Sequence, residues 1–293
     1  MQQVNAMEIS NDRQILAAAG WGHIRLYDIP GVANGAPVST YEGVTKNITS
    51  VGFHEEGRWM YSGGEDGAIR IWDLRSRNLQ AQRLYAATCP INCVSLHPNQ
   101  TELISGDQNG NIHVWDIRND YKANFTSEHD VSIQHLNIEP DGNYLAAVDN
   151  KGQCYMFRLK KNATESKNTC LERRLKLQAH NKFGLKCKFS PDSTLLVTTS
   201  ADARAKIWRT ADLVPLTGHG DDDPSNNTTW PLAENISPLI ELFEKENNQR
   251  WVWDVAFSLD SQYVITGITS FILSRFPFPS FVTSLHSTYQ RDL

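Results

Sequence analysis

His180, Ser200 and Asp202 are the residue types of a serine hydrolase triad, and they lie within one short stretch of the chain. In such a triad the histidine takes the proton of the serine hydroxyl, and the carboxylate orients the imidazole. Many hydrolases hold that serine in a Gly-x-Ser-x-Gly turn, which exposes the hydroxyl above a sheet. Neither position two residues from Ser200 holds a glycine. These surroundings favour a buried hydrogen-bonded network over a nucleophile.

Other catalytic or metal-binding motifs are absent from the sequence. It contains no Cys-x-x-Cys pair, no His-Glu-x-x-His motif and no glycine-rich phosphate loop. We therefore expect neither an enzyme nor a cofactor or metal site. The basic residues Arg173, Arg174 and Lys176 resemble a solvated patch between repeats.

Composition narrows the class of protein further. A net charge of −5 argues against a general binder of nucleic acid or of membrane surfaces, and no apolar run is long enough to span a bilayer. The 5 cysteines are odd in number, which favours free thiols in a reducing compartment over disulfides. These features predict a cytoplasmic protein without membrane insertion.

The elements that would position these residues come from an internal repeat. An aromatic residue followed by a polar one closes each of five units, at intervals of about 42 to 51 residues. The five ends are Tyr27-Asp28, Trp72-Asp73, Trp115-Asp116, Phe157-Arg158 and Trp208-Arg209. Within each unit, segments with apolar residues two apart alternate with turn residues. This pattern predicts an all-β fold, a WD-repeat β-propeller of four-stranded blades.

The repeat offers a structural role for the residues of the apparent triad. His180 lies before a predicted first strand, Ser200 ends the second, Asp202 lies in the next turn and Trp208 ends the third. WD repeats join such residues by hydrogen bonds, so we expect His180, Ser200, Asp202 and Trp208 to form a structural network. Trp72 ends another third strand, as does Trp115, and we expect each indole to pack between blades with its N–H hydrogen-bonded.

Alignment of the predicted first strands defines two sets of strand-start positions. The first set is Gln3, Asn47, Pro90, Ser132, Phe183 and Trp251, and the second is Asn5, Thr49, Asn92, Gln134, Leu185 and Trp253. Trp251 and Trp253 stand out because most equivalent residues are small or polar. Aromatic residues are enriched among the anchors of protein interfaces. Docking of a partner and ordinary packing between blades both remain open as their role.

Several stretches are more specific than the general repeat. They are Gln3–Ala6, Val51–Tyr61, Ile71–Gln80, Pro90–Cys93 and Phe189–Leu196. They closely resemble the family of small WD-repeat subunits of target-of-rapamycin kinase complexes, known as lethal-with-sec-thirteen protein eight or G-protein-beta-subunit-like proteins. The resemblance covers residues 2 to 209 and resumes at 251 to 267.

The resemblance implies a non-catalytic subunit shared by both target-of-rapamycin complexes. Such a subunit docks on the kinase domain of the large Ser/Thr kinase and stabilises its active form, which would connect it to growth and nutrient signalling and to the actin cytoskeleton. The corresponding surface in relatives faces the kinase, so the resemblance assigns Gln3, Asn47, Trp251 and Trp253 to a kinase-docking face. For Gln3, simple solvation is the alternative.

Two other classes of function remain open. One is a general WD-repeat scaffold in another multiprotein assembly, such as a chromatin or ubiquitin-ligase adaptor. The other is a propeller that reads a modified peptide in its central opening, which would need an aromatic or acidic cage that the sequence does not suggest.

The repeat boundaries predict blades at about 2–42, 43–86, 87–129, 130–176, 177–212 and a partial blade at 249–267. The family has seven blades, whereas five to six are represented here, with the first and last missing. We expect a partial or alternatively spliced product and leave open whether the propeller closes.

Two segments depart from the repeat. Residues 213–250 read as an inserted acidic and polar loop around Asp221–Asp223, with a short helix predicted from Ser237-Pro238. A docking loop and an alternative exon are both compatible with it. Residues 268–293 read as an atypical tail, in which prolines between phenylalanines argue against a third strand.

Overall fold

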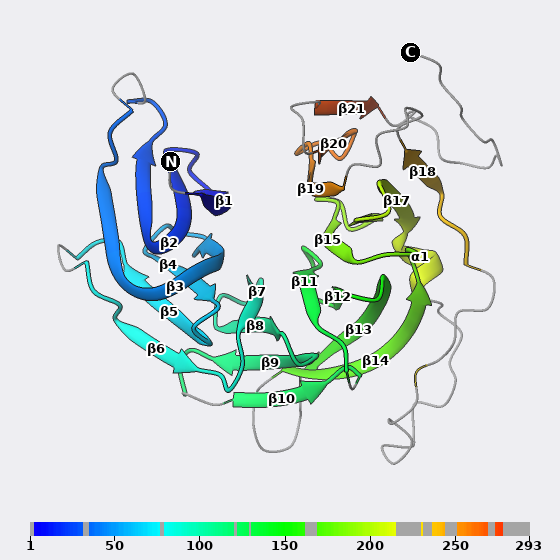
Figure 1. The fold of residues 1–293 in the computed structure, drawn as a ribbon, viewed down its shortest axis with the longest axis horizontal. Coiled ribbons are helices and arrows are strands. Elements are labelled where there is room, and N and C mark those ends of the chain that lie inside the picture. The colour runs from blue at the N-terminus through cyan, green and yellow to red at the C-terminus, as the bar shows by residue number, and fades with distance from the viewer. Residues whose placement is uncertain are drawn as a thin grey trace. The chain divides into compact units, whose positions relative to one another are not determined.

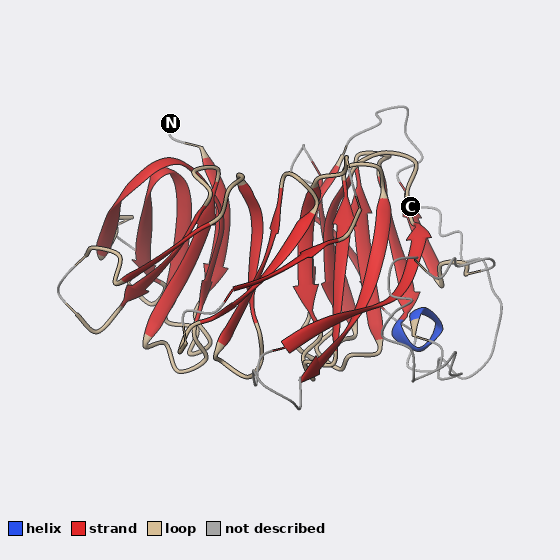
Figure 2. Ribbon diagram, turned by 90° about the horizontal axis from the view of Figure 1, so that it is seen from below, coloured by secondary structure: helices blue, strands red, loops and turns tan. Residues whose placement is uncertain are grey.

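The computed structural model describes residues 3–31, 35–76, 79–119, 122–128, 130–161, 169–214, 230, 236–243, 251–268 and 273–277. The chain divides into two compact units, residues 1–133 and 134–293. Strands are the predominant secondary structure of the described residues. The only helix among them is the four-residue α1 (Thr210–Leu213), drawn in blue in Figure 2.

The strands of the first unit form two antiparallel sheets with the orders β1-β2-β3-β4-β5-β6 and β10-β9-β8-β7 (Figure 1). Their bounds are β1 (Val4–Ile9), β2 (Ile15–Asp28), β3 (Ser39–Phe53), β4 (Trp59–Gly64), β5 (Ala68–Asp73), β6 (Arg83–Ala86), β7 (Ile91–Leu96), β8 (Glu102–Asp107), β9 (Asn111–Asp116) and β10 (Lys122–Thr126).

The six-stranded sheet contains two successive repeats. Residues 48–53 of β3 pair with β4, while residues 39–42 pair with β2, so the last strand of one repeat continues into the first strand of the next. β2 folds back on itself near Gly22, since the Ile29 amide donates to the Gln14 carbonyl at 2.7 Å. Leu74 and Arg58 make the equivalent bond in the second repeat.

In the second unit, the strands form antiparallel sheets with the orders β11-β12-β13-β14, β15-β16-β17-β18 and β19-β20-β21. Their bounds are β11 (Ile133–Ile138), β12 (Tyr144–Asp149), β13 (Gln153–Lys161), β14 (Thr169–Gln178), β15 (Gly184–Phe189), β16 (Leu195–Ser200), β17 (Arg204–Arg209), β18 (Ile240–Phe243), β19 (Val252–Phe257), β20 (Tyr263–Ile268) and β21 (Leu273–Pro277). The strand pattern predicted from alternation is therefore present in both units.

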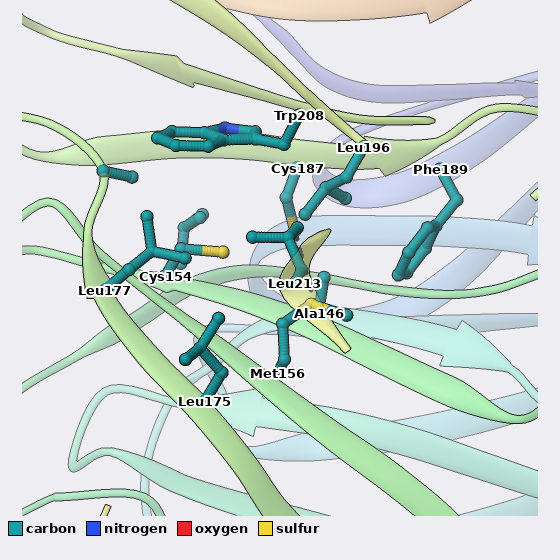
Figure 3. Close-up of a cluster of buried hydrophobic side chains, with 12 residues drawn as sticks. Ala146, Cys154, Met156, Leu175, Leu177, Cys187, Phe189, Leu196, Trp208 and Leu213 are labelled. Atoms are coloured by element: carbon teal, nitrogen blue, oxygen red, sulfur yellow. Dashed lines mark hydrogen bonds between the residues drawn. The ribbon is translucent and has the colours of Figure 1, made fainter. Parts of the chain in front are cut away.

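The core forms where the apolar faces of neighbouring sheets meet. Met156 and Cys154 from the β11–β14 sheet point into the same cluster as Trp208 and Leu196 from the β15–β18 sheet (Figure 3). Leu213 of α1 belongs to this cluster as well. A single sheet cannot bury both of its faces, so each repeat depends on its neighbours for stability.

Glycine is required at the turn between β12 and β13. Gly152 has a φ of 79°, a left-handed conformation that side chains disfavour. A Cβ at this position would also lie 2.3 Å from the carbonyl oxygen of Lys182. The turn therefore fits closely against the segment that leads into β15.

One prediction for the inserted segment was wrong. The short helix expected from Ser237-Pro238 is instead the extended strand β18, which pairs with β17 from Arg204↔Phe243 to Ile207↔Ile240. The Leu239 amide also donates to the Ile207 carbonyl at 2.7 Å. Unpaired backbone groups at the edge of β17 outweighed the local helix signal, because the new strand satisfies them. The β15–β18 sheet is thus completed by residues beyond the predicted boundary at 212.

The second wrong prediction concerns the tail. Leu273–Pro277 forms β21 and pairs with β20, so this segment does take the third-strand position. β21 is the last strand in the order of its sheet, and proline is tolerated at such an edge because its missing N–H removes no ladder bond. The acidic run Asp221–Asp223 and residues 278–293 lie outside the described residues.

Candidate functional site

In the first unit, the strand-start positions form hydrogen bonds to neighbouring repeats. Asn47, in β3, accepts a bond from Asn5 Nδ2 at 3.2 Å and donates its own amide to the Glu65 carboxylate at 3.2 Å. Gln3 lies exposed just before β1. Both polar ends of the Asn47 side chain are therefore already engaged within the unit.

The next two repeats continue the same arrangement. Thr49 Oγ1 donates to the Ile91 carbonyl at 2.7 Å, which lies in the following repeat. Asn92 Nδ2 reaches Ser132 Oγ at 3.0 Å and the Ile133 carbonyl at 2.7 Å. At these positions neighbouring repeats are connected by hydrogen bonds from polar side chains.

In the second unit, the strand-start positions of β15 and β19 are apolar. Phe183 is 50% exposed, Trp251 37% and Trp253 46%. The rings of Trp251 and Trp253 contact each other, with centroids 4.8 Å apart and planes inclined by 39°. Leu185, the remaining member, is half-buried. No hydrogen bond between repeats is available to Leu185, since its side chain has no polar atom.

The strand pattern explains why the two tryptophans face outward. Val252 and Val255 of β19 are buried in a cluster with Val197 and Ile207 of the neighbouring sheet. The register of β19 with β20 shifts between Val252 and Asp254, and this irregularity lets Val252 and Val255 share the buried face while Trp251 and Trp253 stay partly exposed. The two rings therefore form a partly exposed aromatic pair, and their assignment to a docking face stays a prediction.

The apparent triad residues lie in a different place and form no nucleophilic site. His180 Nδ1 is 3.1 Å from Asp202 Oδ2, and His180 Nε2 is 2.8 Å from Thr198 Oγ1. Thr198 Oγ1 also accepts the Trp208 indole N–H at 3.0 Å. Thr198 is thus a member of this network that the prediction from sequence lacked.

Ser200 joins the same network through Asp202. Its hydroxyl accepts the Asp202 amide at 3.0 Å and donates to the Lys182 carbonyl at 3.4 Å. Burial raises the pKa of Asp202, but hydrogen bonds led by that from His180 outweigh it and hold the pKa below its usual value. The buried carboxylate is thereby kept as a stable acceptor, which suits a structural network.

In two other repeats a tryptophan also donates to a hydroxyl at a fixed distance earlier in the sequence, a spacing that the prediction from sequence did not use. The Trp72 indole donates to Ser62 Oγ at 3.0 Å, and the Trp115 indole donates to Ser105 Oγ at 2.9 Å. In both, as for Trp208, the hydroxyl lies 10 residues before the tryptophan. The predicted packing role of Trp72 and Trp115 is confirmed. The constant spacing was a usable signal for Thr198.

Other repeats anchor the same turn with different chemistry. In β8, the buried Asp107 contacts His113 Nε2 at 2.9 Å, while His113 Nδ1 contacts Asn124 Oδ1 at 2.7 Å. In the preceding repeat, Asp66 forms an ion pair of 2.7 Å with Arg70. Each carboxylate bonds within its own turn or sheet, so none is left as a catalytic acid or base.

The remaining candidate chemistry is limited. All five cysteines are free, and Cys93, Cys154 and Cys187 are buried. Across the described residues, no cluster of three or more histidine, cysteine or acidic side chains is placed to hold a metal. None of the described helical segments is long and apolar enough to cross a membrane.

The sheets and their hydrogen-bonded tryptophans define a WD-repeat β-propeller, as predicted. The family model "WD domain, G-beta repeat" matches residues 35–73, 79–116 and 171–209. The β-propeller domain of Cps50 (Swd1) from Myceliophteria thermophila superposes with a TM-score of 0.71, covering 92% of this chain and 80% of that chain. At 16% identity this likeness concerns the fold alone.

Sequence relatives identify the family. Target of rapamycin complex subunit LST8 of Bos taurus is 48% identical over 73% of this chain, and the subunit of the same name in Saccharomyces cerevisiae is 41% identical over 70%. The LST8 homolog of Drosophila melanogaster is 40% identical over 72%. This chain belongs to the LST8 family. The matched region spans 65% of the length of the cattle protein and 66% of the yeast and fly proteins.

Proposed function

We propose that this protein is a non-catalytic subunit of target-of-rapamycin complexes that docks on the kinase domain through Trp251 and Trp253. The bound subunit would stabilise the active form of the kinase, in both complexes, and so act in growth and nutrient signalling and in cytoskeletal organisation. We place this activity in the cytoplasm.

The observation that carries the proposal is the exposed tryptophan pair. Large aromatic side chains dominate interface energetics, and an indole at the centre of an interface contributes 2 kcal/mol or more on truncation, as a rough central value. The names of the relatives supply the partner, since they are called target of rapamycin complex subunits. A rigid scaffold that presents loops and strand ends suits holding a partner in place.

The test is co-expression of the full chain with the kinase domain, followed by size exclusion and a kinase assay. We expect the wild-type chain to co-elute with the kinase domain and to raise its activity. The Trp251→Ala/Trp253→Ala variant should fail in both respects.

Phe243→Ala provides a matched control, because Phe243 is an exposed aromatic residue of the last strand in its sheet, β18, and is not one of the strand-start residues. It should co-elute like the wild type. Co-elution of the double tryptophan variant with the kinase would disprove the docking surface. A folded wild-type chain that does not bind the kinase would disprove the proposed function itself.

The alternative function is a general WD-repeat scaffold in another assembly. Affinity capture of the tagged chain that recovers a different complex, without the kinase, would favour it.

A further inference from the structure

The repeat of strands β11–β14 lacks the tryptophan that three other repeats share. In β5, β9 and β17, Trp72, Trp115 and Trp208 lie opposite the second residue of the preceding strand. In β13, Phe157 takes this position. The residue ten positions before Phe157 is Ala147, whereas each of the three tryptophans donates to a hydroxyl at that distance. Phenylalanine has no N–H to donate, so the indole and its acceptor are replaced together in this repeat.

An indole from elsewhere in the chain packs on this strand. The ring centroid of Trp230 lies 5.0 Å from that of Tyr155 and 5.0 Å from that of Phe157. The ring planes are inclined by 49° and 72°, which suits the tilted and edge-to-face arrangements that aromatic pairs prefer. Both rings of β13 are 0% exposed. Trp230 therefore contacts two side chains that are fully removed from water.

Two cationic side chains of β14 border these rings. Arg173 Cζ lies 5.2 Å from the centroid of Trp230, and Lys176 Nζ lies 5.9 Å from that of Tyr155. The register pairs each of the two cationic residues with one of the two aromatic residues of β13, so all four side chains lie on one face. A cation at this distance is attracted to the face of an aromatic ring. Tyr155, Phe157 and Arg173 thus form a seat for an indole, called the indole seat below.

The described residues that follow Trp230 contact the neighbouring sheet. Ile236 packs against the hydrophobic cluster to which the β11–β14 and β15–β18 sheets both contribute. Strand β18 pairs with β17, and its Glu241 forms an ion pair with Arg204. One stretch of the chain therefore contacts two successive sheets of the second unit.

We propose that Trp230 and β18 are the two anchors of an intramolecular strap, in which Trp230 occupies the indole seat. The strap supplies, from a distant part of the sequence, the indole that the β11–β14 repeat lacks. It ties this sheet to the β15–β18 sheet, so the two anchors stabilise each other. The inference does not depend on kinase docking.

The test measures hydrogen exchange of the β18 amides in the full chain by mass spectrometry. We expect Trp230→Ala to accelerate this exchange by about tenfold, because loss of one anchor makes opening of the other more frequent. Trp230→Phe keeps a ring in the indole seat and should restore most of the protection.

Trp59→Ala is the matched control for the exchange measurement. Trp59 is also half-buried and also contacts two rings, but it lies in the first unit. This variant should leave exchange in β18 unchanged. If Trp230→Ala does not fold, Trp230→Leu takes its place, since leucine keeps part of the apolar contact.

A double-mutant cycle tests whether the indole occupies the seat. Trp230→Ala and Phe157→Leu should each lower the midpoint of thermal unfolding by about 3 °C or more. The combined variant should lose clearly less than the sum of the two, because either substitution already removes the contact that the rings share.

Three results would overturn the proposal. The first is unchanged exchange in β18 when Trp230→Ala is folded. The second is strict additivity of the two substitutions in the cycle, which would mean that the rings share no contact in solution. The third is an equal acceleration by Trp59→Ala, which would show a general loss of stability and no strap.

Discussion

The strand-start positions of the first unit and those of β15 and β19 perform opposite tasks. Asn5, Thr49 and Asn92 direct their polar groups to the next repeat and satisfy them there. Trp251 and Trp253 instead contact each other and stay partly exposed. The same backbone position therefore either joins repeats or presents a partly exposed aromatic side chain, depending on the residue.

Equivalent strand-start positions in different repeats therefore do not have the same role. Asn47 was predicted to dock on the kinase together with the tryptophans, and that assignment remains a prediction. In the structure, however, the Asn47 amide group accepts from Asn5 and donates to Glu65. Binding of a partner there would first have to break internal hydrogen bonds, which favours the aromatic positions as the source of affinity.

The largest expected effect concerns the tryptophans one at a time. Trp253→Ala and Trp251→Ala should each weaken kinase-domain binding by about 30-fold, or roughly 2 kcal/mol, because each removes a large exposed aromatic surface. Calorimetric titration of the purified proteins measures this. If both variants bound the kinase domain with wild-type affinity, the tryptophans would not be the source of binding. The proposed contrast with the polar strand-start positions of the first unit would then be wrong.

The next largest effect is on stability, and it tests whether the hydrogen bonds of Asn92 hold neighbouring repeats together. Asn92→Leu leaves the Ile133 carbonyl without its donor and should lower the free energy of unfolding by about 2 kcal/mol. Asn5→Leu is the matched control, since its bond to Asn47 is exposed and should cost less than about 0.5 kcal/mol. Urea unfolding measures both. Equal losses in the two variants would contradict the larger role of the half-buried link made by Asn92.

A pH-dependent effect is expected at the third residue of β11. Burial lowers the pKa of His135 well below its usual value, and the charges of Lys186 and Lys188 lower it further. The unfolded chain therefore binds a proton more readily than the folded one. Stability should fall as the pH drops below about 6.5 towards the folded pKa, by up to about 1.4 kcal/mol per pH unit.

Urea unfolding at several pH values checks this expectation. His135→Ser places at this position the residue that β3 has, namely Ser50, whose hydroxyl donates to the Val94 carbonyl at 3.0 Å. The variant should lose most of the pH dependence between 6.5 and 5, as a rough window. An unchanged slope would show that another group titrates there.

Phe183 tests how far the aromatic surface extends. It is as exposed as the tryptophans, but it lies at the start of β15 and not in the proposed pair at the start of β19. We therefore expect a smaller effect, in which Phe183→Ala weakens kinase binding by about fivefold, or roughly 1 kcal/mol. Phe243→Ala is again the control. A loss as large as that of Trp253→Ala would place the centre of the surface on β15.

The smallest effect is expected at Asn47. Asn47→Ala should change kinase-domain affinity by less than about twofold, because its polar atoms bond inside the unit. Surface plasmon resonance with the two proteins measures it. A tenfold loss would mean that the polar positions contact the partner as well.

Much of the fold was predictable from local pattern. The five aromatic ends and the alternation between them predicted the propeller, because burial of one strand face requires that alternation. The network expected for His180, Ser200, Asp202 and Trp208 lacked one member. Thr198 and Ser200 lie two apart in β16, and the indole of Trp208 meets the hydroxyl of Thr198 while Ser200 bonds Asp202. Strands β18 and β21 were missed because their local signals, a helix cap and prolines, were outweighed by pairing with an existing edge.

The sequence by itself determined the repeat, the strand alternation, the absence of a nucleophilic turn around Ser200 and the family resemblance. Only the tertiary structure decided that Thr198 completes the network, that Asn47 is engaged internally and that Trp251 and Trp253 contact each other. The physical reason is that periodicity is encoded within each strand, whereas a side chain's hydrogen-bond partner and exposure depend on the neighbouring sheet that packs against it.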